Sequence, residues 1–112
     1  MLEQRIKEII EVEIAKDIKK RASEVKKLGD VVIAIEMTDL NNQTWLIDCR
    51  NSPPSVKAGT MENPDLHVSL ASPDFIEIYE GRLKAESAFF TGKIKLKGSM
   101  GLAMRLGTII KR

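Results

Sequence analysis

The fold is decided by the stretch Lys93-Ile94-Lys95-Leu96-Lys97-Gly98-Ser99-Met100. Its first five residues alternate between lysine and an aliphatic residue, which predicts a strand with the lysines in water and Ile94 and Leu96 facing inward. Gly98 then frees the chain to turn, and Ser99 is placed to cap a last helix over Met100 to Ile110. That helix is apolar on most sides, so it needs more than one apolar neighbour.

Three segments before this strand each predict one element. Leu66 to Ala71 alternates apolar and polar residues, which predicts a strand with one covered face. Ser72-Pro73-Asp74 offers a capping hydroxyl, a proline at the first helical position and an acid in the first turn, which predicts a helix over Phe75 to Glu80. Lys84 to Phe90 predicts another short helix, closed by Gly92.

The N-terminal part of the chain predicts a helix followed by a hairpin. Between Leu2 and Leu28, apolar residues recur at steps of three and four, which predicts one amphipathic helix, or two nearly continuous ones, ended by Gly29. Val31 to Met37 and Thr44 to Arg50 flank a turn-forming segment and predict a β-hairpin. A short edge strand over 55–59 and a loop follow. This order predicts an α+β fold, a five-stranded mixed sheet with helices packed on one face.

The bulk composition is that of an ordinary globular domain. At 112 residues, with 43% hydrophobic and 30% charged residues, the chain is expected to form a single domain over residues 1–112. No signal-peptide pattern and no membrane-spanning apolar run of about 18 residues is found. The single Cys49 excludes an internal disulfide. We therefore expect an intracellular, cytoplasmic protein.

Few residues are candidates for chemistry. The chain has one histidine, His67, one cysteine, Cys49, and neither a C-x-x-C nor an H-E-x-x-H pattern. A histidine on an alternating strand is most often exposed or a hydrogen-bonded structural residue, and a lone cysteine is most often a small buried hydrophobe. We therefore expect no enzymatic activity, no metal site and no cofactor.

Lys93, Lys95 and Lys97 form a basic stripe on the last predicted strand. Such a stripe suits anionic lipid head groups or the phosphates of CoA, and it is equally typical of a solvated strand face. A net charge of +2 and an aromatic content of 4% argue against nucleic acid as a partner. A role in membrane docking or phosphate binding stays open.

The chain resembles a known family from about Arg5 to Ile110, weakly over the first predicted helix and strongly from Pro64 onward. The family is that of the sterol carrier protein type-2, or non-specific lipid-transfer, domains. The similar segments are Trp45-Leu46-Ile47-Asp48, Pro64 to Ser69, Asp74-Phe75 and, closest to the family signature, Glu80 to Leu83 with Ser87 to Leu106.

This resemblance implies a five-stranded sheet covered by helices, with an apolar tunnel between them. The implied ligands are fatty acids, fatty acyl-CoA, sterol-like lipids or phospholipids, held without metal and without bond chemistry. The implied partners are the lipid itself and, transiently, a membrane surface or a lipid-metabolising enzyme. The alternative is an accessory or dimerisation domain that presents lipid-like substrates to a separate enzyme. The ending Lys111-Arg112 departs from the small-Lys-Leu peroxisomal ending of many eukaryotic members.

The tunnel is expected to be centred on the last helix. Flexible methionines in that helix suit a surface that adapts to lipids of different shape. Trp45 is expected to be core first, with its indole bordering the ligand. Of the aromatic and aliphatic residues around the tunnel, about half are expected to touch ligand and the rest to be core. The predicted lipid-binding residues are Trp45, Phe75, Ile78, Tyr79, Leu83, Phe89, Phe90, Ile94, Leu96, Met100, Leu102, Ala103, Met104, Leu106, Ile109 and Ile110.

Overall fold

The computed structural model describes residues 2–110, with side chains described as far as residue 107. The first helix is nearly continuous, as its periodicity predicts, but its geometry changes along its length. It consists of α1 (Leu2–Lys7), the π-helical segment η1 (Glu8–Ile14), α2 (Ala15–Lys20), α3 (Ala22–Val25) and the 3-10 turn η2 (Lys26–Leu28). Arg21, at φ −104° and ψ 33°, interrupts the helix between α2 and α3. Gly29 ends it at a positive φ of 92°, as predicted.

The sheet has five strands in the order β3-β2-β1-β4-β5. The strands are β1 (Val32–Met37), β2 (Gln43–Asp48), β3 (Ser55–Ala58), β4 (Leu66–Leu70) and β5 (Ile94–Gly98). β1 pairs in parallel with β4, and the other neighbours pair antiparallel. The predicted five-stranded mixed sheet is confirmed.

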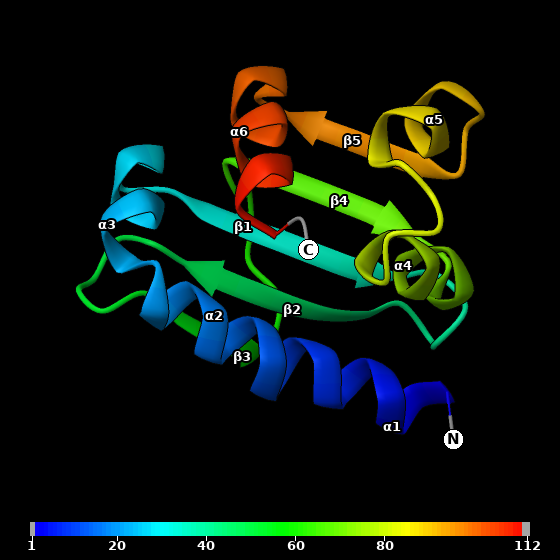
Figure 1. The fold of residues 1–112 in the computed structure, drawn as a ribbon, viewed down its shortest axis with the longest axis horizontal. Helices are drawn as coiled ribbons and strands as arrows, with labels where there is room; N and C mark the ends of the chain where they lie inside the picture. The colour runs from blue at the N-terminus through cyan, green and yellow to red at the C-terminus, as the bar shows by residue number, and fades with distance from the viewer. Residues whose placement is uncertain (1, 111–112) are drawn as a thin grey trace.

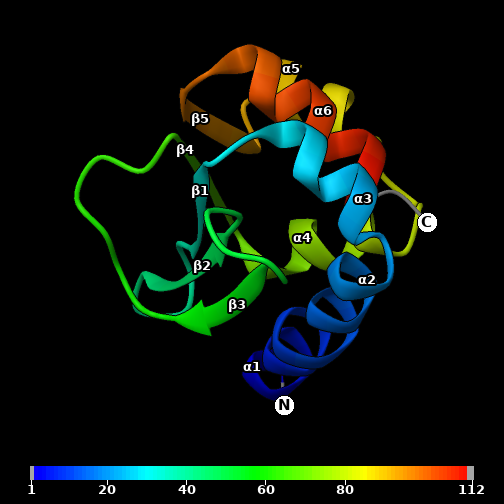
Figure 2. The ribbon, with the colours of Figure 1, turned by 90° about the vertical axis from the view of Figure 1, so that its left-hand side faces the viewer.

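The helices lie on one face of this sheet, as Figures 1 and 2 show. The chain between β3 and β4 passes on the other side (Figure 2). Because side chains alternate along a strand, Ile33, Ile35 and Met37 of β1 join the main core beneath the helices. Val32 and Ala34 form a small second cluster with Leu46. The main core therefore lies between the sheet and the helices.

The C-terminal helices are α4 (Ser72–Tyr79), α5 (Ala85–Phe90) and α6 (Met100–Ile110). Ser99 caps α6 as predicted, because its hydroxyl accepts a hydrogen bond from the Leu102 N–H at 3.1 Å. The predicted capping role of Ser72 is wrong. Ala71 occupies the N-cap position of α4, and both the N–H and the hydroxyl of Ser72 donate to Asp39. The Asp39 carboxylate, in the turn after β1, supplies two charged acceptors where Ser72 would supply one neutral acceptor.

Candidate functional site

Packing divides the apolar interior into two unequal parts. Under the first helix, Ile6, Ile9 and Ile10 are completely buried, and Ile14 and Ile18 nearly so. Around α4, α5, β5 and α6, by contrast, many apolar side chains that pack on the core stay half-buried. We call these seven the C-terminal apolar surface: Ile76, Ile78, Tyr79, Leu83, Phe89, Leu96 and Ala103. Most of the partly buried apolar side chains that pack against the core therefore lie in this part of the molecule.

The predicted lipid-binding residues fall into three classes of exposure. Trp45, Phe75, Ile94, Leu102 and Leu106 are buried. Ile78, Tyr79, Leu83, Phe89, Leu96 and Ala103 are half-buried and belong to the C-terminal apolar surface. Phe90, Met100 and Met104 are exposed. The side chains of Ile109 and Ile110 lie outside the described residues.

The position of each α6 residue on the helix decides its class. Leu102 and Leu106, one turn apart, face the core, and Ala103 beside them is half-buried. Met100 and Met104, also one turn apart, are 47% and 74% exposed. The helix looks apolar all round in sequence, but in the structure its neighbours cover only part of its circumference.

Trp45 is completely buried on β2, under the first helix. Its indole Nε1–H donates to the Glu11 carboxylate of η1 at 2.7 Å. A buried indole needs such a partner, because its N–H would otherwise lose the hydrogen bond that water provides. Trp45 therefore connects the sheet to the π-helical segment.

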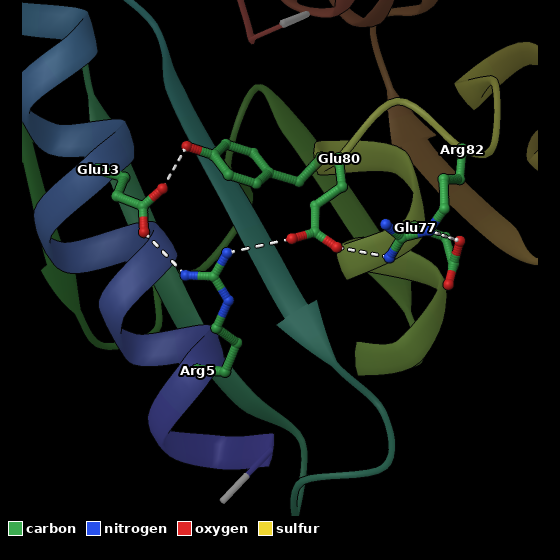
Figure 3. A network of polar contacts seen from close by, with 6 residues as sticks. Arg5, Glu13, Glu77, Glu80 and Arg82 are labelled. Carbon is green, nitrogen blue, oxygen red and sulfur yellow. Dashed lines mark hydrogen bonds and ion pairs between the residues drawn. The ribbon is translucent and has the colours of Figure 1, made fainter.

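A polar network joins the first helix to α4 and the turn after it (Figure 3). Glu13 accepts from Arg5 at 2.9 Å and from the Tyr79 hydroxyl at 2.8 Å. Arg5 also donates to Glu80, at 3.3 Å. The hydroxyl of Tyr79 thus takes part in the network while its ring stacks on Phe75, with centroids 6.4 Å apart. Sequence reasoning missed this network, because residues 66 and 75 positions apart give no local signal.

Arg82 completes the network on the side of α4. It binds Glu77 at 2.7 Å and also donates to Glu80. The hydrogen bond from Arg82 is the main reason that the pKa of Glu80 lies below its ordinary value. These pairs are solvent-exposed, so water screens them and each contributes little to stability.

His67 has a structural hydrogen bond, as predicted. Its Nε2 lies 2.8 Å from a Glu36 oxygen, and the Ser69 hydroxyl donates to the same oxygen at 3.3 Å. Asn42 donates to the other Glu36 oxygen. Histidine and serine therefore converge on the carboxylate, and this geometry does not form the serine–histidine contact that a nucleophilic serine needs.

Cys49 is buried, as predicted. Burial, followed by the nearby charge of Asp48, raises the pKa of its thiol to about 11. Because the thiolate is the reactive form, the thiol is not activated for nucleophilic attack. Asp48 is held ionised by Arg50, whose hydrogen bonds lower the pKa of Asp48 to about 2.

A hollow of about 310 Å³ lies next to Cys49, away from the C-terminal apolar surface. Its lining is of mixed polarity and comes from α3 and the chain after β2: Ala22, Ser23, Val25, Lys26, Asp30, Cys49, Arg50, Asn51, Ser52 and Pro54. It is therefore not the predicted apolar tunnel. In the described part of the chain, no group of three His, Cys, Asp or Glu residues is arranged to hold a metal ion.

Comparison with known proteins connects this geometry to a family. The model of the SCP-2 sterol transfer family matches residues 6–111. The non-specific lipid-transfer protein-like 1 of Caenorhabditis elegans is 33% identical over 104 residues, which cover 92% of this chain and 88% of that protein. The peroxisomal multifunctional enzyme A of Dictyostelium discoideum is 34% identical over 93 residues, but the match spans only 21% of that enzyme.

A solved structure shares the fold. The sterol carrier protein domain 2 of Helicoverpa armigera aligns with a TM-score of 0.72 at 24% identity, over 95% of this chain and 83% of that one. No helix within residues 2–110 combines the length and the apolar character needed to cross a membrane.

Proposed function

The chain belongs to the SCP-2 sterol transfer family, and we propose that it binds and transfers lipids and holds its lipid against the C-terminal apolar surface. The observation that carries this proposal is the uneven packing of the core. The isoleucines of the first helix are fully or almost fully buried, whereas around α4, α5, β5 and α6 many apolar side chains stay half-buried beside buried ones. A ligand that separates α6 from α4 and α5 would bury those side chains and create the apolar tunnel.

The physics of such a site favours broad specificity. Transfer of a lipid chain from water to an apolar surface gains about 0.8 kcal/mol per methylene. The gain is nondirectional, so fatty acids, fatty acyl-CoA, sterol-like lipids and phospholipids can all compete for the same surface. Tyr79 belongs to this surface and donates its hydroxyl to Glu13, which also pairs with Arg5, and we propose that these polar groups contact the lipid head group.

We expect Ala103→Phe to weaken the binding of a fluorescent fatty acid about tenfold or more. Ala103 is half-buried on α6 and packs against the core, so an added ring would occupy the space proposed for the lipid. Excluding only two methylenes costs about 1.6 kcal/mol, which is more than a tenfold change in affinity. Fluorescence titration of both proteins measures the difference.

Ala85→Phe is the matched control, because Ala85 is an exposed alanine at the start of α5. It should bind the fatty acid like the wild type. Thermal unfolding of both variants checks that each is folded at the titration temperature. Equal affinity of the Ala103→Phe and wild-type proteins would place the ligand elsewhere.

We further propose that residues 1–112 act as one carrier domain without chemistry of their own. The raised pKa of the Cys49 thiol and the structural role of His67 support this reading. A free thiol at Cys49 supports action in a reducing compartment such as the cytoplasm.

A second candidate function is that of an accessory domain which presents a lipid-like substrate to a separate enzyme. The match to a fifth of a multifunctional enzyme favours this candidate. Transfer of a labelled lipid between vesicles separates the two. A shuttle should raise the transfer rate in proportion to protein concentration, whereas tight binding without faster transfer would support the accessory role.

A further inference from the structure

The polar network that Tyr79 joins to the C-terminal apolar surface carries an excess of negative charge. Its carboxylates are those of Glu13, Glu77 and Glu80, and its guanidinium groups are those of Arg5 and Arg82. Three carboxylates and two guanidinium groups leave the network with one negative charge in excess. A head group that reaches this network therefore meets a local field that repels anions.

Both arginines of the network are already shared between carboxylates of the protein. Figure 3 shows Arg5 between Glu13 and Glu80, at 2.9 Å and 3.3 Å. Arg82 likewise pairs with Glu77 and Glu80. The carboxylate of a free fatty acid would have to compete with these groups for the same cations. It would gain an ion pair only where the protein loses or weakens one, and its own charge would add to the excess.

The inner part of the network is the less screened part. The side chains of Arg5, Glu13 and Glu80 are 36%, 33% and 29% exposed, whereas those of Glu77 and Arg82 are 45% and 56% exposed. Because charges farther from water interact more strongly, the inner carboxylates act on a ligand more than the outer pair does.

Glu13 can accept a hydrogen bond from a ligand without losing those it has. A carboxylate offers about four acceptor sites. One Glu13 oxygen accepts from the Tyr79 hydroxyl at 2.8 Å and the other from Arg5 at 2.9 Å, so each oxygen keeps a lone pair. Tyr79 is half-buried, and its ring stacks on Phe75, so the contact with Glu13 lies at the apolar surface itself. A hydroxyl or an ammonium group can donate to Glu13, but an ionised carboxylic acid has no proton to donate.

We propose that Glu13 makes the site select, among lipids of equal chain length, those whose head group donates hydrogen bonds and carries no negative charge. This inference rests on the proposed function, because it names the head group of the lipid held against the C-terminal apolar surface. Burial of the chain is nondirectional and contributes equally for every head group, so the head group alone decides the ranking. A hydrogen bond to a charged group is worth about tenfold or more in affinity.

Displacement of the uncharged dye Nile red by three lipids of equal chain length tests the selection at neutral pH. Hexadecanol, hexadecylamine and palmitate differ only in their head groups, which are a hydroxyl, an ammonium and a carboxylate. Hexadecanol and hexadecylamine should displace the dye from the wild type at a concentration about tenfold lower than palmitate does. Whichever of these two acts at the lower concentration identifies the preferred donor.

Glu13→Gln should change the affinities for the charged lipids in opposite directions. The variant network has no net charge, and Arg5 keeps only one of its two carboxylates. Palmitate should therefore bind about tenfold more tightly and hexadecylamine about tenfold more weakly. Misfolding cannot produce a gain for one lipid and a loss for another. Glu80→Gln removes the same charge but no hydrogen bond with Tyr79, so it should act in the same directions with smaller changes.

Glu62→Gln is the matched control. Glu62 is exposed in the chain between β3 and β4, which passes on the other side of the sheet (Figure 2), and no described residue forms an ion pair with it. This variant changes the charge of the whole protein by the same amount as Glu13→Gln. It should keep the wild-type ranking of the three lipids, and a ranking altered as much as in Glu13→Gln would refute a local role for Glu13.

Two further results would overturn the selection while leaving the carrier function intact. One is wild-type affinity for palmitate equal to or above that for hexadecanol. The other is an equal loss of all three lipids in Glu13→Gln, which would show that the network only holds the first helix against α4. If none of the three lipids bound to the wild type, the proposed function itself would be overturned.

Discussion

Gly98→Ala should destabilise the protein by at least about 3 kcal/mol, the largest loss expected from any single methyl group added to it. Gly98 has a φ of 118°, which L side chains rarely adopt. A Cβ at this position would lie 2.4 Å from the backbone oxygen of Asp65. Strain and overlap therefore act together, and backbone atoms cannot move aside as the end of a flexible side chain can.

The damage would reach both the sheet and the last helix. Gly98 pairs with Leu66 at the junction of β4 and β5, and the next residue, Ser99, donates its N–H to Asp65 and caps α6. Thermal unfolding followed by circular dichroism should show a loss of roughly 10 °C or more. Gly101→Ala is the control. Gly101 is inside α6, where an added Cβ meets only the Ser99 hydroxyl, at 3.9 Å.

Gly101→Ala should be neutral or stabilise the protein by up to about 1 kcal/mol, because alanine is the better helix former. Equal stability of the Gly98→Ala and wild-type proteins would show that β4 and β5 can separate at this point without cost. It would also remove the reason for a glycine between this strand and this helix.

The elements with local signals were predictable from the sequence. Alternation along β5, the turn at Gly98 and the cap at Ser99 are properties of neighbouring residues, and the structure confirms each of them. The placement of the helices on one face of the sheet also follows from the sequence, because helices gather on the face that the strands leave apolar.

Features that depend on distant residues could not be predicted. Asp39 meets Ser72 across 33 positions, and Glu13 meets Tyr79 across 66. Which residues of α6 are exposed also depends on distant parts of the chain. Ala103 and Met104 are adjacent in a uniformly apolar segment, yet Ala103 is half-buried and Met104 is 74% exposed. Only the placement of the neighbouring elements decides which face of an apolar helix is covered, so sequence could name the site's elements but not sort its residues.

Asp39→Ala should cost about 2 kcal/mol or more, because it leaves two donors of Ser72 without a partner. Ser72 is completely buried, and its N–H donates to Asp39 at 2.8 Å while its hydroxyl donates to the second carboxylate oxygen. Asp39 is itself exposed, so water can enter part of the vacated space, but a neutral water molecule is a weaker acceptor than the carboxylate. Urea denaturation measures the loss, and Asp74→Ala is the control: Asp74 is in the first turn of α4 but is not seen to cap a donor. It should cost less than about 1 kcal/mol, the part that comes from the helix dipole.

The same contact makes stability depend on pH. Burial by itself would raise the pKa of Asp39, but the two hydrogen bonds from Ser72 outweigh it and leave the pKa below its ordinary value of 3.8. A lowered pKa in the folded state means that the stabilisation is fully present above pH 3.8 and is lost as the pH falls through the lower, folded value. Asp39→Asn keeps an acceptor for the Ser72 N–H but cannot titrate, so its stability at neutral pH should fall less than that of Asp39→Ala. Below pH 4 the free energy of unfolding of Asp39→Asn should fall less than that of the wild type, because the variant lacks this one titrating carboxylate. If both proteins lose stability equally as the pH falls, Asp39 is not ionised in the folded protein.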